Sequence, residues 1–262
     1  GNVSPKMAAL VAEAGLTAFA GQMGKSIDII SEGTCLIISG SSGADSVLQA
    51  AADLCETLAV TVLVSNAEHV PIDRRFDCVV GSVRNATGAL GGFTLKIDGL
   101  QKIIVGGRGE FNLTPPQDGA ASQCDIIVDL SGQNPMFPAH EKRDGYLRAD
   151  PTHAPSVAKA VFAASQMIGT FEKPLYVRLE ESLCAHKRAE QPACSNCLNV
   201  CPTGAILSAG EHVTIDPMIC AGCGSCAAVC PSGAISYDAP PVDTLFRRLS
   251  TLASTYTQAG GE

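Results

Sequence analysis

The sequence has no excess of basic charge and no long hydrophobic run. Its 18 Lys and Arg residues are outnumbered by 26 Asp and Glu residues, which gives a formal net charge of −8. Nucleic acids and anionic membranes attract basic faces, so a strongly acidic chain is a poor candidate for either partner. No window approaches the roughly 18 consecutive apolar residues of a membrane-spanning helix. Because 46% of the 262 residues are hydrophobic, a core can form, and we expect a soluble globular protein.

Several sequence signatures of enzyme sites are also missing. There is neither the G-x-G-x-x-G fingerprint of dinucleotide-binding folds nor a G-x-x-x-x-G-K-S/T phosphate loop. No C-x-x-C is followed by His, which excludes c-type haem attachment. Gly40–Gly43 and Gly106–Gly109 are therefore interpreted as ordinary glycine-rich turns. No set of nucleophile and base can be picked out, so we expect no substrate chemistry of the chain's own.

Residues 1–170 have the pattern of an α/β or mixed-sheet domain. A buried strand at Cys35–Ser39, a helix at Ala44–Thr57 and a strand at Val60–Val64 make a βαβ unit with a right-handed crossover. More β-rich runs follow, and glycine-rich turns separate them. These runs are Cys78–Val80, Gly92–Ile97, Lys102–Val105 and Asp125–Asp129. Their short connections indicate a sheet with antiparallel as well as parallel strands.

Three other segments of this half give specific predictions. Asp98-Gly99 stands between two β-rich runs, as a hairpin turn does. Gln133–Pro155 holds four prolines and many charges, which predicts a long surface connection before a helix at Ser156–Met167. Met7–Gln22 has the spacing of an amphipathic helix, and Glu13 inside it argues against a signal peptide.

Cysteine is the most informative residue type in the composition. There are 12 cysteines, and eight of them fall between Cys184 and Cys230. In a chain of this length, so dense a segment indicates metal ligation rather than disulfides, and therefore a reducing compartment such as the cytoplasm. The others lie singly in or beside apolar runs, where we expect small buried hydrophobic side chains. They are Cys35, Cys55, Cys78 and Cys124.

The dense segment contains two related motifs. Cys220–Pro231 is a complete C-x2-C-x2-C-x3-C-P run, a spacing at which thiolates wrap an iron–sulfur cubane. Cys194–Pro202 reads C-x2-C-x3-C-P, and the similar sequences that follow both prolines mark an internal duplication with copies 29 residues apart. The upstream copy has Gln191 in place of a first cysteine, and Cys184 is the simplest substitute. Zinc ribbons also use paired C-x2-C motifs, but seldom in this register.

The segment from Phe171 to Asp238 resembles the bacterial two-cluster ferredoxins. The resemblance implies an α+β domain over residues 171–240 that holds two 4Fe–4S clusters with crossed ligation. One cluster would take as ligands Cys184, Cys194, Cys197 and Cys230. The other would take Cys201, Cys220, Cys223 and Cys226. The C-x9-C opening departs from the family pattern at the first of these ligands.

The resemblance implies electron transfer, with the chain as a relay within or toward a larger oxidoreductase system. The whole chain also resembles the N-terminal part of larger bacterial iron–sulfur proteins associated with formate dehydrogenase systems. The resemblance rests on the segments Cys184-Ala-His186 and Cys220–Cys226. A redox partner of that type is therefore implied. Two alternatives stay open: an oxidoreductase subunit whose α/β half binds a nucleotide or flavin, and an interaction platform in metalloenzyme maturation.

Two further predictions concern the end of the chain and the long loop of the cysteine segment. Residues 241–262 are predicted to form an amphipathic helix followed by a glycine-rich linker, which indicates that a further domain follows. His186, Lys187 and Arg188 fall between Cys184 and Cys194. We interpret these three residues as a solvated loop tip, the alternative being that their charge tunes a cluster or docks a partner.

Overall fold

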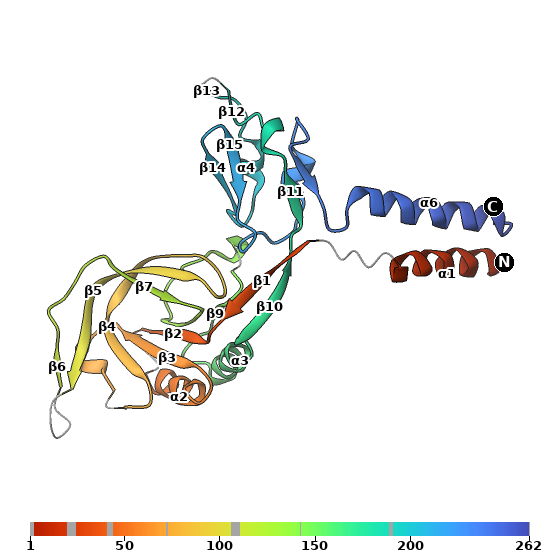
Figure 1. The fold of residues 1–262 in the computed structure, drawn as a ribbon. Coiled ribbons are helices and arrows are strands. Elements are labelled where there is room, and N and C mark those ends of the chain that lie inside the picture. The colour runs from red at the N-terminus through yellow and green to blue at the C-terminus, as the bar shows by residue number, and fades with distance from the viewer. Residues whose placement is uncertain are drawn as a thin grey trace. The chain divides into compact units, whose positions relative to one another are not determined.

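The chain forms two compact units (Figure 1). A computed structural model describes residues 3–19, 25–40, 44–71, 73–105, 111–141, 143–188 and 191–261. One unit runs from Asp28 to Phe171, and the other combines Gly1–Ile27 with Glu172–Glu262. The boundaries fall within two strands that pair with each other, β1 (Ser26–Ser31) and β10 (Gly169–Pro174).

The unit from Asp28 to Phe171 is built on an eight-stranded mixed sheet, which confirms the predicted α/β class with a mixed sheet. The strand order is β6-β5-β4-β3-β2-β8-β9, with β7 paired to β5. Strands β2, β3, β4, β8 and β9 pair in parallel, whereas β5 runs antiparallel to β4, β6 and β7. The bounds are β2 Thr34–Ser39, β3 Ala59–Val64, β4 Asp77–Thr87, β5 Phe93–Val105, β6 Phe111–Leu113, β7 Ala120–Cys124, β8 Ile126–Leu130 and β9 Tyr146–Arg148.

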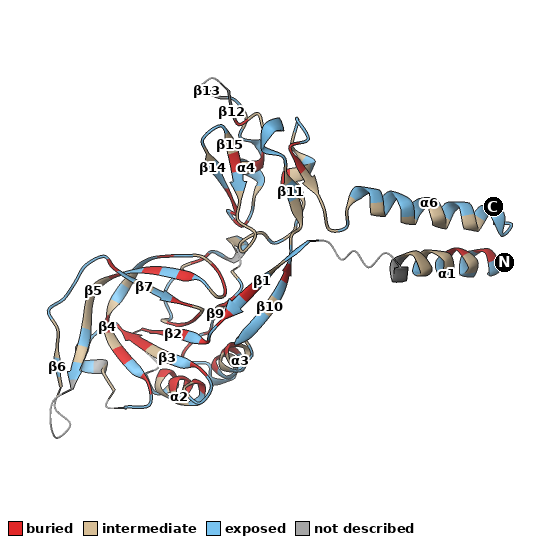
Figure 2. Ribbon diagram, in the orientation of Figure 1, coloured by how far each residue is buried: buried red, intermediate tan, exposed pale blue. Residues whose placement is uncertain are grey.

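The central strands are apolar on both faces because both faces are covered. On one face, Leu36 and Leu63 join a core cluster with Phe93 and Leu95 of β5. Alternate residues of β2, β3 and β8 point to the other face, where helices α2 (Ala44–Leu54) and α3 (Ala154–Ser165) contact these strands. Figure 2 shows buried positions along the strands and on both helices. Each such buried side chain contributes about 1.5–3 kcal/mol, which explains the continuous apolar runs in the sequence.

The prediction that Asp98-Gly99 forms a hairpin turn is wrong. β5 continues without a break through these residues, and both of its halves pair with β4. The register shifts between Val80 and Ser82 of β4, so that β5 carries one extra residue there. Gly99 has φ +61°, the left-handed conformation that such a bulge requires. A bulge and a hairpin turn use the same freedom of glycine, so the dipeptide does not distinguish them.

The predicted surface connection at Gln133–Pro155 is also wrong in part, because it contains the edge strand β9. The Tyr146 hydroxyl donates a hydrogen bond of 2.5 Å to a carboxylate oxygen of Asp129, which is buried at the end of β8. The same carboxylate accepts bonds from the amide of Ser131 at 3.0 Å and from its hydroxyl at 2.6 Å. These bonds hold the segment to the sheet. Counting prolines and charges does not reveal them.

The stability of this unit should fall at alkaline pH. Burial, and then the hydrogen bond to Asp129, raise the pKa of Tyr146, and burial raises the pKa of Cys35 to about 12. A group whose pKa is raised in the folded state contributes its full stability below the unfolded-state pKa and loses it as the pH rises toward the folded-state pKa. We therefore expect the urea midpoint of unfolding to drop above about pH 9.

The variant Tyr146→Phe separates this contribution from the general alkaline effect. It leaves Asp129 with one hydrogen bond fewer, so it should be less stable at pH 7 by about 1–3 kcal/mol. Its urea midpoint should nevertheless fall less between pH 9 and pH 11 than that of the wild type, because one titrating group is gone. Parallel pH profiles for the two proteins would contradict the prediction.

The second unit consists of short antiparallel strand pairs, three-residue to five-residue helical segments and two longer helices. β11 pairs with β16, β12 with β13 and β14 with β15. The bounds are α1 Ser4–Phe19, β11 Val177–Leu179, β12 Lys187–Arg188, β13 Gln191–Pro192, α4 Asn196–Val200, β14 Ile206–Ala209, β15 His212–Ile215, α5 Ser225–Ala228, β16 Ile235–Tyr237 and α6 Val242–Gln258.

Helices α1 and α6 come from opposite ends of the chain and lie side by side (Figure 1). They confirm that helices form near the N- and C-terminal ends, as predicted, and residues 20–22 of the predicted N-terminal helix lie outside the described residues. Glu13 forms an ion pair with Arg248 across the helix pair, and Ala9 is buried. Among the described residues, no helix combines the length and apolar character needed to cross a membrane.

Candidate metal centre

The duplicated sequence folds as two similar halves. β11, α4 and β14 belong to the first half, and β15, α5 and β16 to the second. The strands of the two halves pair across, β11 with β16 and β14 with β15. Cys197 of α4 and Cys226 of α5 are both buried, and so are Ile206 and Ile235 at corresponding positions 29 residues apart. The repeat seen in the sequence therefore extends to the packing of the core.

The first set of cysteines lines one cavity. Four thiols and two buried apolar side chains are among the residues of its wall: Cys184, Cys194, Cys197, Cys230, Val213 and Ile235. Burial raises the pKa of the Cys197 thiol, and the neighbouring thiols of Cys194 and Cys184 add to the rise. Cys184, which precedes the long loop, therefore lies beside the cysteines of the upstream motif. Cys230, the last cysteine of the downstream motif, lines the same cavity.

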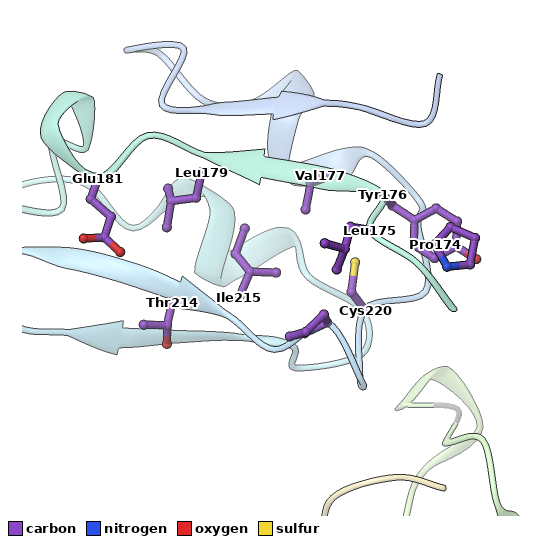
Figure 3. A pocket seen from close by; sticks show the side chains of 10 residues that line it. Pro174, Leu175, Tyr176, Val177, Leu179, Glu181, Thr214, Ile215 and Cys220 are labelled. Carbon is purple, nitrogen blue, oxygen red and sulfur yellow. The ribbon is translucent and has the colours of Figure 1, made fainter. Parts of the chain in front are cut away.

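The second set surrounds Cys226. Burial raises the pKa of its thiol to about 11, and the nearby thiols of Cys220, Cys223 and Cys201 contribute to the rise. The sulfur of Cys220 points into a pocket of about 280 Å³ whose wall includes residues of β11 and β15 (Figure 3). The side chains around that sulfur are mainly apolar, with Val177 and Ile215 among them.

Each motif ends in a turn that donates hydrogen bonds to its last thiol. Burial opposes ionisation of Cys201, but the hydroxyl of Thr203 and the amides of residues 203, 205 and 206 outweigh it and lower the pKa of the thiol. The same balance lowers the pKa of Cys230, through the amide of Ile235, the hydroxyl and amide of Ser232 and the amide of residue 234. The hydroxyl oxygens lie 3.6 Å and 3.7 Å from the two sulfurs. Both turns therefore favour a thiolate.

The loop between Cys220 and Cys223 depends on a glycine. Gly222 has φ +72°, and a Cβ atom there would lie 2.5 Å from the Tyr176 ring. The hydroxyl of Tyr237 donates a bond of 3.0 Å to the carbonyl oxygen of Gly222. Two tyrosines thus fix the backbone of the loop, a role that the cysteine spacing does not indicate.

The interpretation of His186 as part of a solvated loop tip is wrong. Its side chain is buried, with 6% of its surface exposed, and it lines the cavity of the first cysteine set. Its Nδ1 lies 2.7 Å from the carbonyl oxygen of Cys194, and its Nε2 lies 2.7 Å from the hydroxyl of Ser208. Lys187 and Arg188 form a two-residue ladder with Gln191 and Pro192.

The four single cysteines belong to the unit from Asp28 to Phe171. Cys35, Cys78 and Cys124 are buried, as predicted, and burial raises the pKa of each thiol. Cys55 is only partly buried, and its thiol donates to the carbonyl oxygen of Ala52. The glycine-rich segments interpreted as turns, 41–43 and 106–109, lie outside the described residues.

The donor set fits an iron–sulfur cluster. Soft thiolate ligands select iron–sulfur clusters, zinc or copper(I). Among the residues that the structure describes, no three His, Cys, Asp or Glu side chains converge closely enough to hold a single metal ion. Four thiols line one cavity, and the thiols of Cys201, Cys220 and Cys223 lie near enough to Cys226 to influence its ionisation. Four cysteines are the complement that a 4Fe–4S cluster requires.

Comparison with known proteins agrees with this chemistry. A family model described as a 4Fe-4S dicluster domain matches residues 192–234. This range holds seven of the eight cysteines of the dense segment, and Cys184 lies outside it. No curated protein matches the chain. The match supports an iron–sulfur domain of the ferredoxin type and binding of 4Fe–4S clusters, two of which a dicluster domain suggests.

Proposed function

We propose that the chain transfers electrons through two 4Fe–4S clusters, as a ferredoxin-like relay within or toward a larger oxidoreductase. The observation that carries the proposal is the cavity in which Cys230 of the downstream motif stands among Cys184, Cys194 and Cys197. This position of Cys230 supports the crossed ligation that two-cluster ferredoxins use, in which the last cysteine of one motif binds the cluster of the other. When bound, such clusters take up and release single electrons without breaking substrate bonds.

In this proposal each thiol set holds one cluster. The ligands are Cys184, Cys194, Cys197 and Cys230 on one side, and Cys201, Cys220, Cys223 and Cys226 on the other. Hydrogen bonds from Thr203 to Cys201 and from Ser232 to Cys230 stabilise negative charge on the sulfur. Because reduction adds negative charge, these donors favour the reduced state and raise the reduction potential.

The charge of the chain bears on its partner. The formal net charge of −8 leaves an acidic protein, and thiolate-bound clusters add further negative charge. We propose a redox partner with a basic docking face, since complementary charge speeds association. A formate dehydrogenase-type oxidoreductase, in a reducing compartment such as the cytoplasm, is the partner that the sequence resemblance suggests.

Anaerobic iron and acid-labile sulfide analysis tests the proposal directly. We expect about eight of each per chain, together with an electron paramagnetic resonance (EPR) spectrum of two interacting clusters after dithionite reduction. After removal of excess dithionite, the reduced clusters should lose their EPR signal on addition of a higher-potential electron acceptor such as a cytochrome, which is reduced in turn. Zinc in place of iron, with no labile sulfide, would overturn the proposal.

A further inference from the structure

The unit from Asp28 to Phe171 contains a pocket of about 470 Å³. Its wall includes the first residues of β2, β3 and β4 and parts of β5 and β7. The sheet curves so that β7, which pairs with β5, also contacts β2. The pocket lies on the concave side of this curved sheet, at the end where β2, β3 and β4 begin. The volume is within the range of about 300–1,000 Å³ that small-molecule sites occupy.

The floor of the pocket is apolar. Leu36, Ile97 and Leu100 line it, and all three also belong to or pack against the core cluster of the unit. Phe76 adds a buried aromatic ring. A compact apolar group that enters the pocket would therefore lie on a preformed surface, without first opening the core.

The rim of the pocket is cationic. Three basic side chains, Arg74, Arg75 and Lys102, line it together with one acid, Asp77. Arg75 is held by an ion pair of 2.7 Å with Asp73. Within the part of the chain that the structure describes, neither Arg74 nor Lys102 has a carboxylate within ion-pair distance. This gathering of cations contrasts with the net charge of −8 of the whole chain.

Register explains why Lys102 is at the rim. It lies opposite Val79 of β4, and Val79 packs against the core cluster, so both residues are on the concave face of the sheet. Thr61 and Asp77 are paired on the same face, and Ser122 of β7 adds a hydroxyl. The pocket therefore combines an apolar floor with hydrogen-bond donors and free positive charge at its mouth.

We propose that this pocket binds a small organic anion, whose apolar body lies on Leu36, Ile97 and Leu100 and whose charged group meets Arg74 and Lys102. Carboxylate, phosphate and sulfonate groups share the chemistry that these donors recognise. The site goes beyond the electron-transfer function, because it belongs to the other unit and needs no cluster.

Calorimetric titration of the anaerobic holoprotein with 8-anilinonaphthalene-1-sulfonate tests the proposal. This probe joins an aromatic body to one anionic group, and we expect one saturable site per chain. Lys102→Met and Arg74→Gln should each weaken its binding by about tenfold, as expected for loss of a charged hydrogen bond. Asp77→Asn should strengthen binding, because it removes the negative charge that lines the rim beside the cations. Lys159→Met is the matched control, since Lys159 is exposed on α3 and does not line the pocket.

The neutral analogue N-phenyl-1-naphthylamine isolates the role of charge. It should bind the wild type about tenfold more weakly than the sulfonate and should not respond to Lys102→Met. The exposed apolar side chains of α1 and α6, such as Met7 and Phe246, could also take up either dye. Equal binding by wild type and all pocket variants would assign the dye to such surfaces and overturn the proposal, whatever the iron content.

Discussion

Replacing Cys197 by Ala should reduce the iron content from about eight toward about four atoms per chain and leave one intact 4Fe–4S cluster. Cys197 is buried in the cavity that also holds Cys184, Cys194 and Cys230, so its loss removes one of four thiols from a single set. Cys226→Ala should give the same count by removing the other cluster. In both variants the EPR signature of two interacting reduced clusters should become that of an isolated one.

The remaining cysteines provide the controls for this experiment. Cys78→Ala changes a buried thiol that belongs to the other unit, so this variant should keep about eight iron atoms. Cys184→Ala tests whether Cys184 is a cluster ligand, since this cysteine lies outside the residues that the family model matches. An iron count like that of Cys197→Ala would support Cys184 as a ligand, and about eight iron atoms would refute it.

Local pattern predicted the parallel part of the sheet well. The strands at residues 34–39 and 59–64 and the helix between them follow directly from apolar runs whose length and spacing match each element. Strand β5 is harder to predict, because the dipeptide Asp98-Gly99 is compatible with both a hairpin turn and a β-bulge. β9 was missed because its three residues are too few to show a period, and because Tyr146 is held by a distant carboxylate.

The pairing of the two terminal helices shows a different limit. Amphipathic spacing predicts each helix separately, since it reports that one face must be covered. It does not report which surface covers that face. The ion pair between Glu13 and Arg248 joins residues 235 positions apart, and no local property of either segment indicates the other.

For the candidate site, the cysteines were predicted and their supporting residues were not. A thiol ligand is identified by residue type and spacing, and both are visible in the sequence. The donors to Cys201 and Cys230 are largely backbone amides, which every residue except proline has. Only the repeated S/T-G-A-I after each Cys-Pro could have indicated them. The role of His186 depends on burial, which its charged neighbours in the sequence obscured.

Replacing His186 by Leu should destabilise the cluster held beside it and leave the other cluster unaffected. A carbonyl oxygen only accepts hydrogen bonds, so Nδ1 of His186 donates the hydrogen bond to the carbonyl oxygen of Cys194, and Nε2 is hydrogen-bonded to the hydroxyl of Ser208. The backbone carbonyl oxygen of His186 also accepts hydrogen bonds from the amide nitrogens of Ala193 and Cys194, at N–O distances of 2.8 Å and 3.3 Å. His186 therefore holds the end of the loop between Cys184 and Cys194 against β14, and so fixes the backbone at Cys194, the first cysteine of the upstream motif.

Leucine would leave the Cys194 carbonyl and the Ser208 hydroxyl without these partners, at about 1–3 kcal/mol for each group. We therefore expect a ferrous chelator to remove about half of the iron at least tenfold faster than from the wild type, with a changed reduction potential for that half alone. His186→Asn should restore part of the loss, because its amide can donate to the Cys194 carbonyl. The exposed His153, changed to Leu, should have no effect. Uniform loss of both clusters would refute a positioning role and indicate general unfolding instead.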